Sequence, residues 1–208
     1  MSPLARKIAA TGFLGAIAFF LGVTRIGFIP VANVAGDATV MHVPAILGGV
    51  LEGPVVGILV GAIFGLSSLL KAGNPIFADP LVSIVPRLFI GLVAYLAFIG
   101  FKRFSLYLGW IAAGVMGTLT NTILVLSMAF FRGYITLDVI VTIIPQAIAE
   151  IVIAIVLTIA IARGVDLWHN GRESWYASDV ENVDELTDYL YGPEIQYGFK
   201  SRLRHQKK

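Results

Sequence analysis

Apolar residues run along this chain in long blocks separated by short polar stretches. A helix needs roughly 20 apolar residues to cross the hydrocarbon core of a bilayer. The second block is too short to span alone, and such a segment is tolerated in a membrane only where protein or a cavity covers its ends. The pattern predicts six membrane helices, over residues 8–29, 43–52, 54–71, 80–101, 106–131 and 137–162.

Composition and charge agree with this pattern. Of the 208 residues, 57% are hydrophobic and 13% are charged, and the mean hydropathy is +0.85, far from the averages of soluble domains. Nine of the 15 Lys and Arg, but only five of the 13 Asp and Glu, lie in residues 1–165. We predict an all-α integral membrane protein, a six-helix bundle with a short second helix over residues 1–165, followed by a polar cytoplasmic tail over residues 166–208.

Basic residues in the short loops predict the orientation, because cytoplasmic loops carry an excess of Lys and Arg. With the N-terminus inside, Arg6, Lys7, Lys102 and Arg103 all lie on the cytoplasmic side. We expect both termini in the cytoplasm, the turn at Glu52 on the same side, and the protein in the plasma membrane. The outward loops are then those near residues 30–42, 72–80 and 132–137.

Small residues recur at four-residue spacing in two of the predicted helices. In lipid, such faces let helices approach closely, since van der Waals packing replaces the hydrophobic drive. For the third helix we expect internal packing through Gly57, Gly61 and Gly65. For the first helix, packing within the chain and docking onto a separate membrane subunit both remain open. Its small pairs are Ala5 and Ala9, Thr11 and Gly15, Gly12 and Ala16, and Ala18 and Gly22.

Polar residues inside the apolar blocks are costly in a membrane and therefore mark candidate sites. Arg87 either forms an internal ion pair with Glu150 or clamps an anionic ligand, because a guanidinium offers a bidentate fork to a carboxylate. Asn121 either joins two helices or contacts a ligand. His42 is either a ligand contact or an ordinary polar residue of the membrane interface, and Gln146 follows Pro145 in the sixth helix.

The sequence lacks the motifs of catalysis and nucleotide binding. It has no Cys, no His-Glu spacing for a metal, no phosphate loop and no nucleophile elbow. The net charge of +2 is too small to indicate nucleic-acid binding. We predict that the chain is not an enzyme and that it uses no cofactor and no metal.

The tail begins with aromatic residues that suit a membrane interface, Trp168, Trp175 and Tyr176. An acidic run over residues 179–188 and a basic end from Lys200 follow. Disorder is one alternative for this segment. Its further aromatic residues leave docking on another protein as a second alternative.

In order and spacing, several of these segments resemble the substrate-binding S-components of energy-coupling factor (ECF) vitamin transporters. The resemblance covers residues 5–163 and rests on the small-residue first helix and on the motifs MHVPAILGGVLEGPVVG, FGLSSLL, IVPRLFIGLVAYL, GTLTNTILVL and QAIAEIVIAI. It is nearest to the pantothenate type, in which a His-x-Pro start, a Pro-Arg pair and a Thr-Asn-Thr run occur together. The long tail and the Glu at position 52 depart from the family pattern.

The resemblance implies a bundle that binds a vitamin at its outer side and hands it over together with a transmembrane T-component and two cytoplasmic ATPases. Docking would use the small face of the first helix, namely Ala5, Ala9, Gly12 and Ala16. The Glu52 corner would face such a partner. The implied ligand contacts are Arg87 as carboxylate clamp with His42, Asn74, Asn121, Gln146 and Glu150 as polar contacts.

Two rival interpretations accompany this one. The chain could be an accessory or structural subunit of a larger membrane complex that keeps the same scaffold and docks through its tail. It could also be a stand-alone carrier in which Glu150 couples transport to protons. Recovery of a T-component and ATPases through the core, without residues 166–208, would separate the first rival from an importer subunit.

Overall fold

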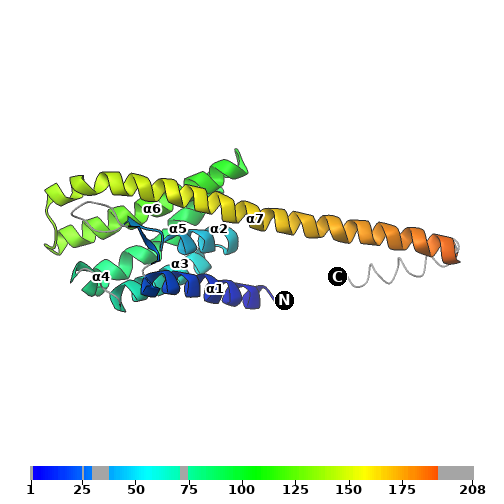
Figure 1. The fold of residues 1–208 in the computed structure, drawn as a ribbon, viewed down its shortest axis with the longest axis horizontal. Coiled ribbons are helices and arrows are strands. Elements are labelled where there is room, and N and C mark those ends of the chain that lie inside the picture. The colour runs from blue at the N-terminus through cyan, green and yellow to red at the C-terminus, as the bar shows by residue number, and fades with distance from the viewer. Residues whose placement is uncertain (1, 25, 30–37, 71–74, 192–208) are drawn as a thin grey trace. The chain divides into compact units, whose positions relative to one another are not determined.

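The computed structural model describes residues 2–24, 26–29, 38–70 and 75–191, with side chains described up to Trp168 (Figure 1). The predicted all-α membrane protein with six helices is confirmed. Four helices in the described part are long and apolar enough to cross a membrane, and α2 and α3 are shorter apolar helices. The main helices are α1 (Pro3–Thr24), α2 (Val43–Glu52), α3 (Pro54–Leu70), α5 (Val85–Phe101), α6 (Leu106–Phe131) and α7 (Leu137–Tyr191).

Proline and glycine set several of the helix boundaries. A proline occupies the first turn of α2, where its missing N–H is not needed. Gly53 then ends α2 with a φ of 97°, a conformation that residues with a side chain rarely adopt, and Pro54 begins α3. A short 3-10 helix η1 (Pro75–Ala78) and α4 (Pro80–Ser83) precede α5. The predicted bounds of the second and fifth helices, 43–52 and 106–131, are those of the structure.

The structure corrects the prediction at both ends of the chain. Helix α1 begins and ends about five residues earlier than the predicted 8–29, and an unpredicted antiparallel pair follows, β1 (Phe28–Ile29) with β2 (Ala38–Thr39). Strands of two residues are too short to produce a period in the sequence. Helix α7 continues to Tyr191, because no proline interrupts the chain between residues 146 and 192. The part of the tail up to Tyr191, for which disorder was one alternative, is therefore helical.

The chain divides into two compact units, Met1–Ala162 and Arg163–Lys208. The first unit contains α1 to α6 and the beginning of α7. In the second, the described side chain of Arg163 donates to Asp166 Oδ2 at 3.3 Å. The candidate site lies wholly in the first unit.

Glycines bring three helices of the first unit into backbone contact. A Cβ atom added at Gly57 of α3 would lie 2.8 Å from Gly91 Cα of α5 and 2.9 Å from Gly49 Cα of α2. One added at Gly61 would meet the carbonyl oxygen of Arg87, and one at Gly65 would lie 2.9 Å from Ile84 Cα. Real Cβ atoms do not come so close to backbone atoms. The expected internal packing of the α3 glycines is thus confirmed. The contacts at Gly61 and Gly65 hold the beginning of α5 against α3.

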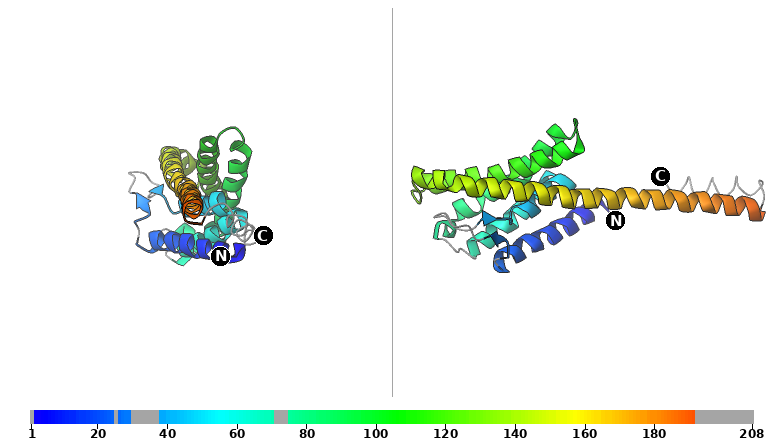
Figure 2. Two further views of the ribbon diagram at one scale, coloured as in Figure 1. Left: turned by 90° about the vertical axis from the view of Figure 1, so that its right-hand side faces the viewer. Right: turned by 45° about the horizontal axis from the view of Figure 1, so that its top comes forward.

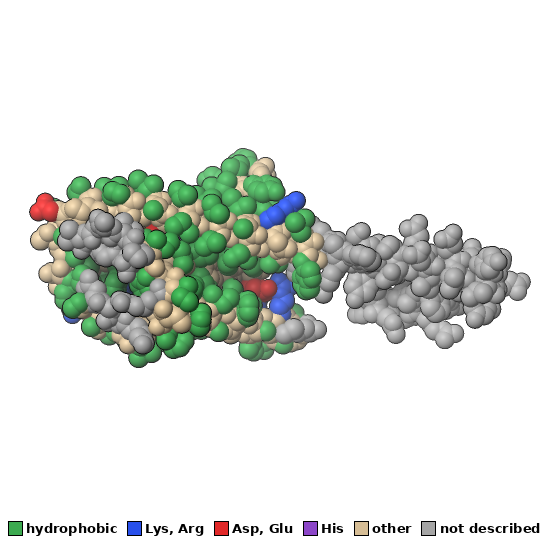
Figure 3. Space-filling model, in the orientation of Figure 1, with side chains coloured by type: hydrophobic (Ala, Val, Ile, Leu, Met, Phe, Trp, Pro, Cys, Tyr) green, Lys and Arg blue, Asp and Glu red, His purple; other side chains and the backbone are tan. Residues whose placement is uncertain are grey.

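Helix α1 packs on α3 along one side of the bundle (Figure 2). Its inner face consists of Gly15, Ala18 and Gly22, which are buried, and a Cβ at Gly15 would meet the side chain of Ile63. Away from this inner face, Ala9, Gly12 and Ala16 are exposed and Ala5 is partly buried. Apolar side chains cover most of the visible surface of the bundle, as expected for a protein surrounded by lipid (Figure 3).

Ion pairs occur at both ends of the bundle. Arg6 Nε donates to both carboxylate oxygens of Glu52 at 2.9 Å, which ties the start of α1 to the turn between α2 and α3. At the opposite end, Arg132 Nε lies 2.6 Å from Asp79 Oδ2. We call these the Glu52 end and the Asp79 end. Glu52 was expected to face a partner, and within the chain it is held by Arg6.

Candidate functional site

The shortness of α2 places His42 deep inside the bundle. Helix α2 starts after His42 and ends at Glu52, and ten residues span about 15 Å, half of the hydrocarbon core. His42 is 0% exposed. Its side chain is therefore enclosed by the protein and exposed neither to water nor to lipid, while its role as a ligand contact stays a prediction. The space towards the Asp79 end is left to the strands, η1 and the beginning of α5.

One hydrogen bond positions the His42 ring. Its Nε2 lies 3.0 Å from Thr118 Oγ1, near the middle of α6. The Thr118 hydroxyl in turn donates to the carbonyl oxygen of Gly114 at 2.8 Å. His42 Nδ1 is buried and has no hydrogen-bond partner.

Arg87 lies in the first turn of α5, where the close approach of Gly61 holds its backbone. Its Nη1 donates to the carbonyl oxygen of Val82, and its guanidinium carbon lies 5.3 Å from the ring centre of Phe64 and 5.1 Å from that of Phe77. Arg87 is 4% exposed, and its Nε is buried without a hydrogen-bond partner. Within the described residues it pairs with no carboxylate, so the expected alternative of an ion pair with Glu150 is wrong.

Asn121 is close to this cluster because it lies one turn after Thr118 on the same side of α6. The residue is 6% exposed, and its Oδ1 is buried without a partner. His42 and Arg87 are near enough for an electrostatic interaction. The structure therefore gathers three of the predicted ligand contacts, each with one buried polar atom that is not hydrogen-bonded.

Glu150 and Gln146 form a second polar group on α7. Glu150 Oε1 accepts the backbone N–H of Thr39 at 2.7 Å and the side-chain amide of Gln146 at 3.3 Å. Both residues are buried. Through its bond to Thr39, Glu150 attaches strand β2 to α7. This structural role does not require a ligand. Asn74, the remaining predicted contact, lies outside the described residues.

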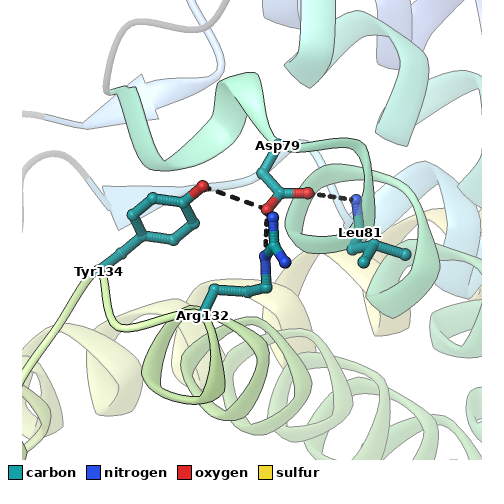
Figure 4. Close-up of polar contacts among 4 residues, drawn as sticks. All are labelled: Asp79, Leu81, Arg132 and Tyr134. Atoms are coloured by element: carbon teal, nitrogen blue, oxygen red, sulfur yellow. Dashed lines mark hydrogen bonds and ion pairs between the residues drawn. The ribbon is translucent and has the colours of Figure 1, made fainter.

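A cluster at the Asp79 end joins Asp79, Leu81, Arg132 and Tyr134 (Figure 4). Asp79 caps α4 by accepting the N–H of Leu81 at 2.9 Å, and it also accepts Arg132 Nε at 2.6 Å and the Tyr134 hydroxyl at 3.2 Å. The Leu81 N–H, together with Arg132 and Tyr134, lowers the pKa of the Asp79 carboxyl, and Asp79 raises the pKa of Arg132. Because Phe77 and Val82 both contact Arg87, this cluster fixes the surroundings of the guanidinium.

Several contributing residues were not among the predicted contacts. Thr118 could have been found, since it lies three residues before Asn121 and hence on the same helix face. Phe64, Phe77 and the backbone N–H of Thr39 carry no signal in the sequence, because their roles depend on how distant segments pack. Within the described residues, no group of three or more His, Asp or Glu side chains could hold a metal ion.

The fold defines an all-α integral membrane protein, and the polar cluster inside its apolar bundle is typical of a protein that handles a small ligand. The sequence matches the family "ECF transporter, substrate-specific component" over residues 6–162, which is most of the chain. The chain therefore belongs to this family and is a component of a transporter. A comparison with curated proteins finds no match.

Proposed function

We propose that this chain is the substrate-capture subunit of an ECF-type vitamin importer and that its ligand is a small anionic vitamin, with pantothenate as the first candidate. In this proposal the Asp79 end faces outwards and both termini are cytoplasmic. The ligand is bound between His42, Arg87 and Asn121 and is handed over with a T-component and two ATPases.

The observation that carries the proposal is that Arg87 is buried without an opposite charge among the described residues. A buried cation is costly unless an opposite charge is close to it. Among the described residues, Arg87 hydrogen-bonds only to a carbonyl oxygen and lies over two aromatic rings, no carboxylate pairs with it, and its Nε–H has no acceptor. A carboxylate ligand would supply both the missing charge and the missing acceptor.

Pantothenate suits the rest of the cluster as well. It combines a carboxylate with hydroxyl groups and an amide, whereas the cluster combines a guanidinium with two polar atoms able to accept hydrogen bonds. The Pro-Arg pair at residues 86 and 87 and the Thr-Asn-Thr run at residues 120–122 also favour the pantothenate type. These observations support pantothenate as the ligand and are independent of the family membership.

The exposed side of α1 supports the proposed docking on a T-component. Ala9, Gly12 and Ala16 are small and exposed, and a Cβ at Gly12 would have no atom within 4 Å. A second membrane helix could approach this side closely. We therefore propose Ala5, Ala9, Gly12 and Ala16 as the docking face.

Binding of radiolabelled pantothenate to the purified full-length chain tests the ligand. Arg87→Ala should weaken binding by at least about a hundredfold, because it removes a buried charge-assisted hydrogen bond. Arg163→Ala, at a position in the second unit, is the matched control and should bind normally. Unchanged affinity in Arg87→Ala would reject the clamp.

The assignment of pantothenate can be wrong even if the capture role is right. If pantothenate does not bind but another anionic vitamin does, and that binding depends on Arg87, then only the pantothenate assignment is wrong. If a panel of anionic vitamins gives no binding to folded protein, the capture role itself is wrong.

A further inference from the structure

We propose that Thr118 holds His42 in the tautomer with its proton on Nε2, so that Nδ1 is a hydrogen-bond acceptor that selects acids carrying hydroxyl donors. The inference rests on the proposed function, since it concerns the ligand of the same cluster. Thr118 acts here as a positioning residue, because it sets the polarity of a neighbouring group.

The tautomer follows from counting hydrogens. Thr118 Oγ1 makes two close contacts, 2.8 Å to the Gly114 carbonyl oxygen and 3.0 Å to His42 Nε2. A carbonyl oxygen has no hydrogen, so the single hydroxyl hydrogen must lie between the two oxygens. The contact with His42 then needs a hydrogen on Nε2. The histidine is the donor and Thr118 the acceptor.

This tautomer also determines the hydrogen-bonding role of the second ring nitrogen, Nδ1. In a neutral imidazole with its proton on Nε2, Nδ1 carries a lone pair and accepts. A doubly protonated ring would add a second cation to a buried site that already contains Arg87, and burial disfavours such a charge. Nδ1 is buried and has no partner. A ligand group that meets it favourably must donate a hydrogen.

Among the described residues, three of the buried atoms without hydrogen-bond partners belong to His42, Arg87 and Asn121, and together they indicate which groups a ligand needs. Arg87 Nε offers a donor and a positive charge, while His42 Nδ1 and Asn121 Oδ1 offer acceptors. A ligand that satisfies all three combines an anionic or carbonyl oxygen with at least two hydrogen-bond donors. An acid with an aliphatic chain in place of its hydroxyl groups would leave buried acceptors without hydrogens, which is unfavourable.

Nitrogen-15 NMR of histidine-labelled protein in detergent tests the tautomer without any ligand. The signals of His42 are assigned by their loss in His42→Ala. In the wild type we expect a protonated Nε2 and an unprotonated Nδ1. Thr118→Val should abolish this single tautomer, and Thr118→Ser, which keeps the hydroxyl, should restore it. A protonated Nδ1 in the wild type would overturn the proposal.

Matched pairs of acids test the selectivity. Pantothenate is compared with N-(3,3-dimethylbutanoyl)-β-alanine, which lacks the hydroxyl groups, and other small carboxylic acids are compared in the same way. We expect the hydroxylated member to bind about tenfold or more tightly to the wild type and to Thr118→Ser. In Thr118→Val this preference should shrink while the binding of the deoxy member changes little.

The outcomes separate the two proposals. Equal binding of the two members of each pair, or failure of every hydroxylated acid to bind, would overturn the selectivity. Binding of another hydroxylated acid but not of pantothenate would reject the vitamin assignment and support the role of Thr118.

Discussion

Helices α1 and α3 carry small residues at the same spacing, yet the fold uses the two stripes differently. On α3, Gly57 and Gly61 lie against the backbone of α5, and Gly65 lies against the backbone of Ser83 and Ile84 just before it. On α1, Gly12 has open space where a side chain would be, and Ala9 and Ala16 are exposed beside it. The α3 stripe is filled by the chain itself, whereas no described residue covers Gly12 on the α1 stripe. Spacing indicates that close packing is possible, but not which partner provides it.

The largest effect should come from filling the α3 stripe. A methyl group at Gly61 would meet the Arg87 carbonyl oxygen, so Gly61→Ala forces α3 and α5 apart and should reduce stability by about 2–3 kcal/mol. Thermal unfolding in detergent measures the loss. Gly12→Ala is the control and should unfold like the wild type. Equal unfolding temperatures for the two variants would contradict the packed role of the α3 stripe.

A larger side chain on the α1 stripe should affect assembly instead of folding. Gly12→Leu points into open space, so unfolding and ligand binding should stay normal. If a T-component docks on this face, its capture in detergent should weaken about tenfold, or by about 1.4 kcal/mol, because close helix approach is blocked. Phe13→Leu, a change at an exposed neighbouring position, is the control and should leave capture normal. Normal capture by Gly12→Leu would place the docking face elsewhere.

The Asp79 cluster, near the end of the α3 stripe, should make a smaller, pH-dependent contribution to the stability of the folded protein. Because the folded state lowers the pKa of Asp79, its stabilising effect is fully present above the ordinary carboxyl pKa, about 4. That effect is lost as the pH falls through the lowered value. Asp79→Asn should be less stable at neutral pH and should lose this part of the acid dependence. Parallel acid dependence in variant and wild type would exclude a role for this carboxyl.

The smallest effect is expected at the Glu52 end, where one ion pair holds the start of α1. The Arg6 side chain is 58% exposed, so solvent weakens its pairing with Glu52. Arg6→Ala should cost less than about 1 kcal/mol. Unfolding at increasing salt should bring the wild type and the variant together. A loss as large as that of Gly61→Ala would mean that α1 depends on this pair more than on its inner face.

The positions of most helices could be predicted because apolar length, proline and glycine act locally. The strand pair and the full length of α7 could not, since a two-residue strand has no period and the polar stretch after Ala162 looked like a tail. Candidate site residues were visible because Arg87 and Asn121 stand out in apolar segments. Their partners were not visible. Glu150 was considered as the counter-ion of Arg87, but strand β2 brings the Thr39 N–H to it instead.

The contact of Gly49, Gly57 and Gly91 has a mechanical consequence. Where three backbones touch, no flexible side chains lie between them to absorb a displacement, so α2, α3 and α5 should move as a single rigid body. His42 and Arg87 are both attached to this body, at the start of α2 and of α5. If the protein tilts in the membrane, the two residues travel together, and their spacing is preserved throughout the movement.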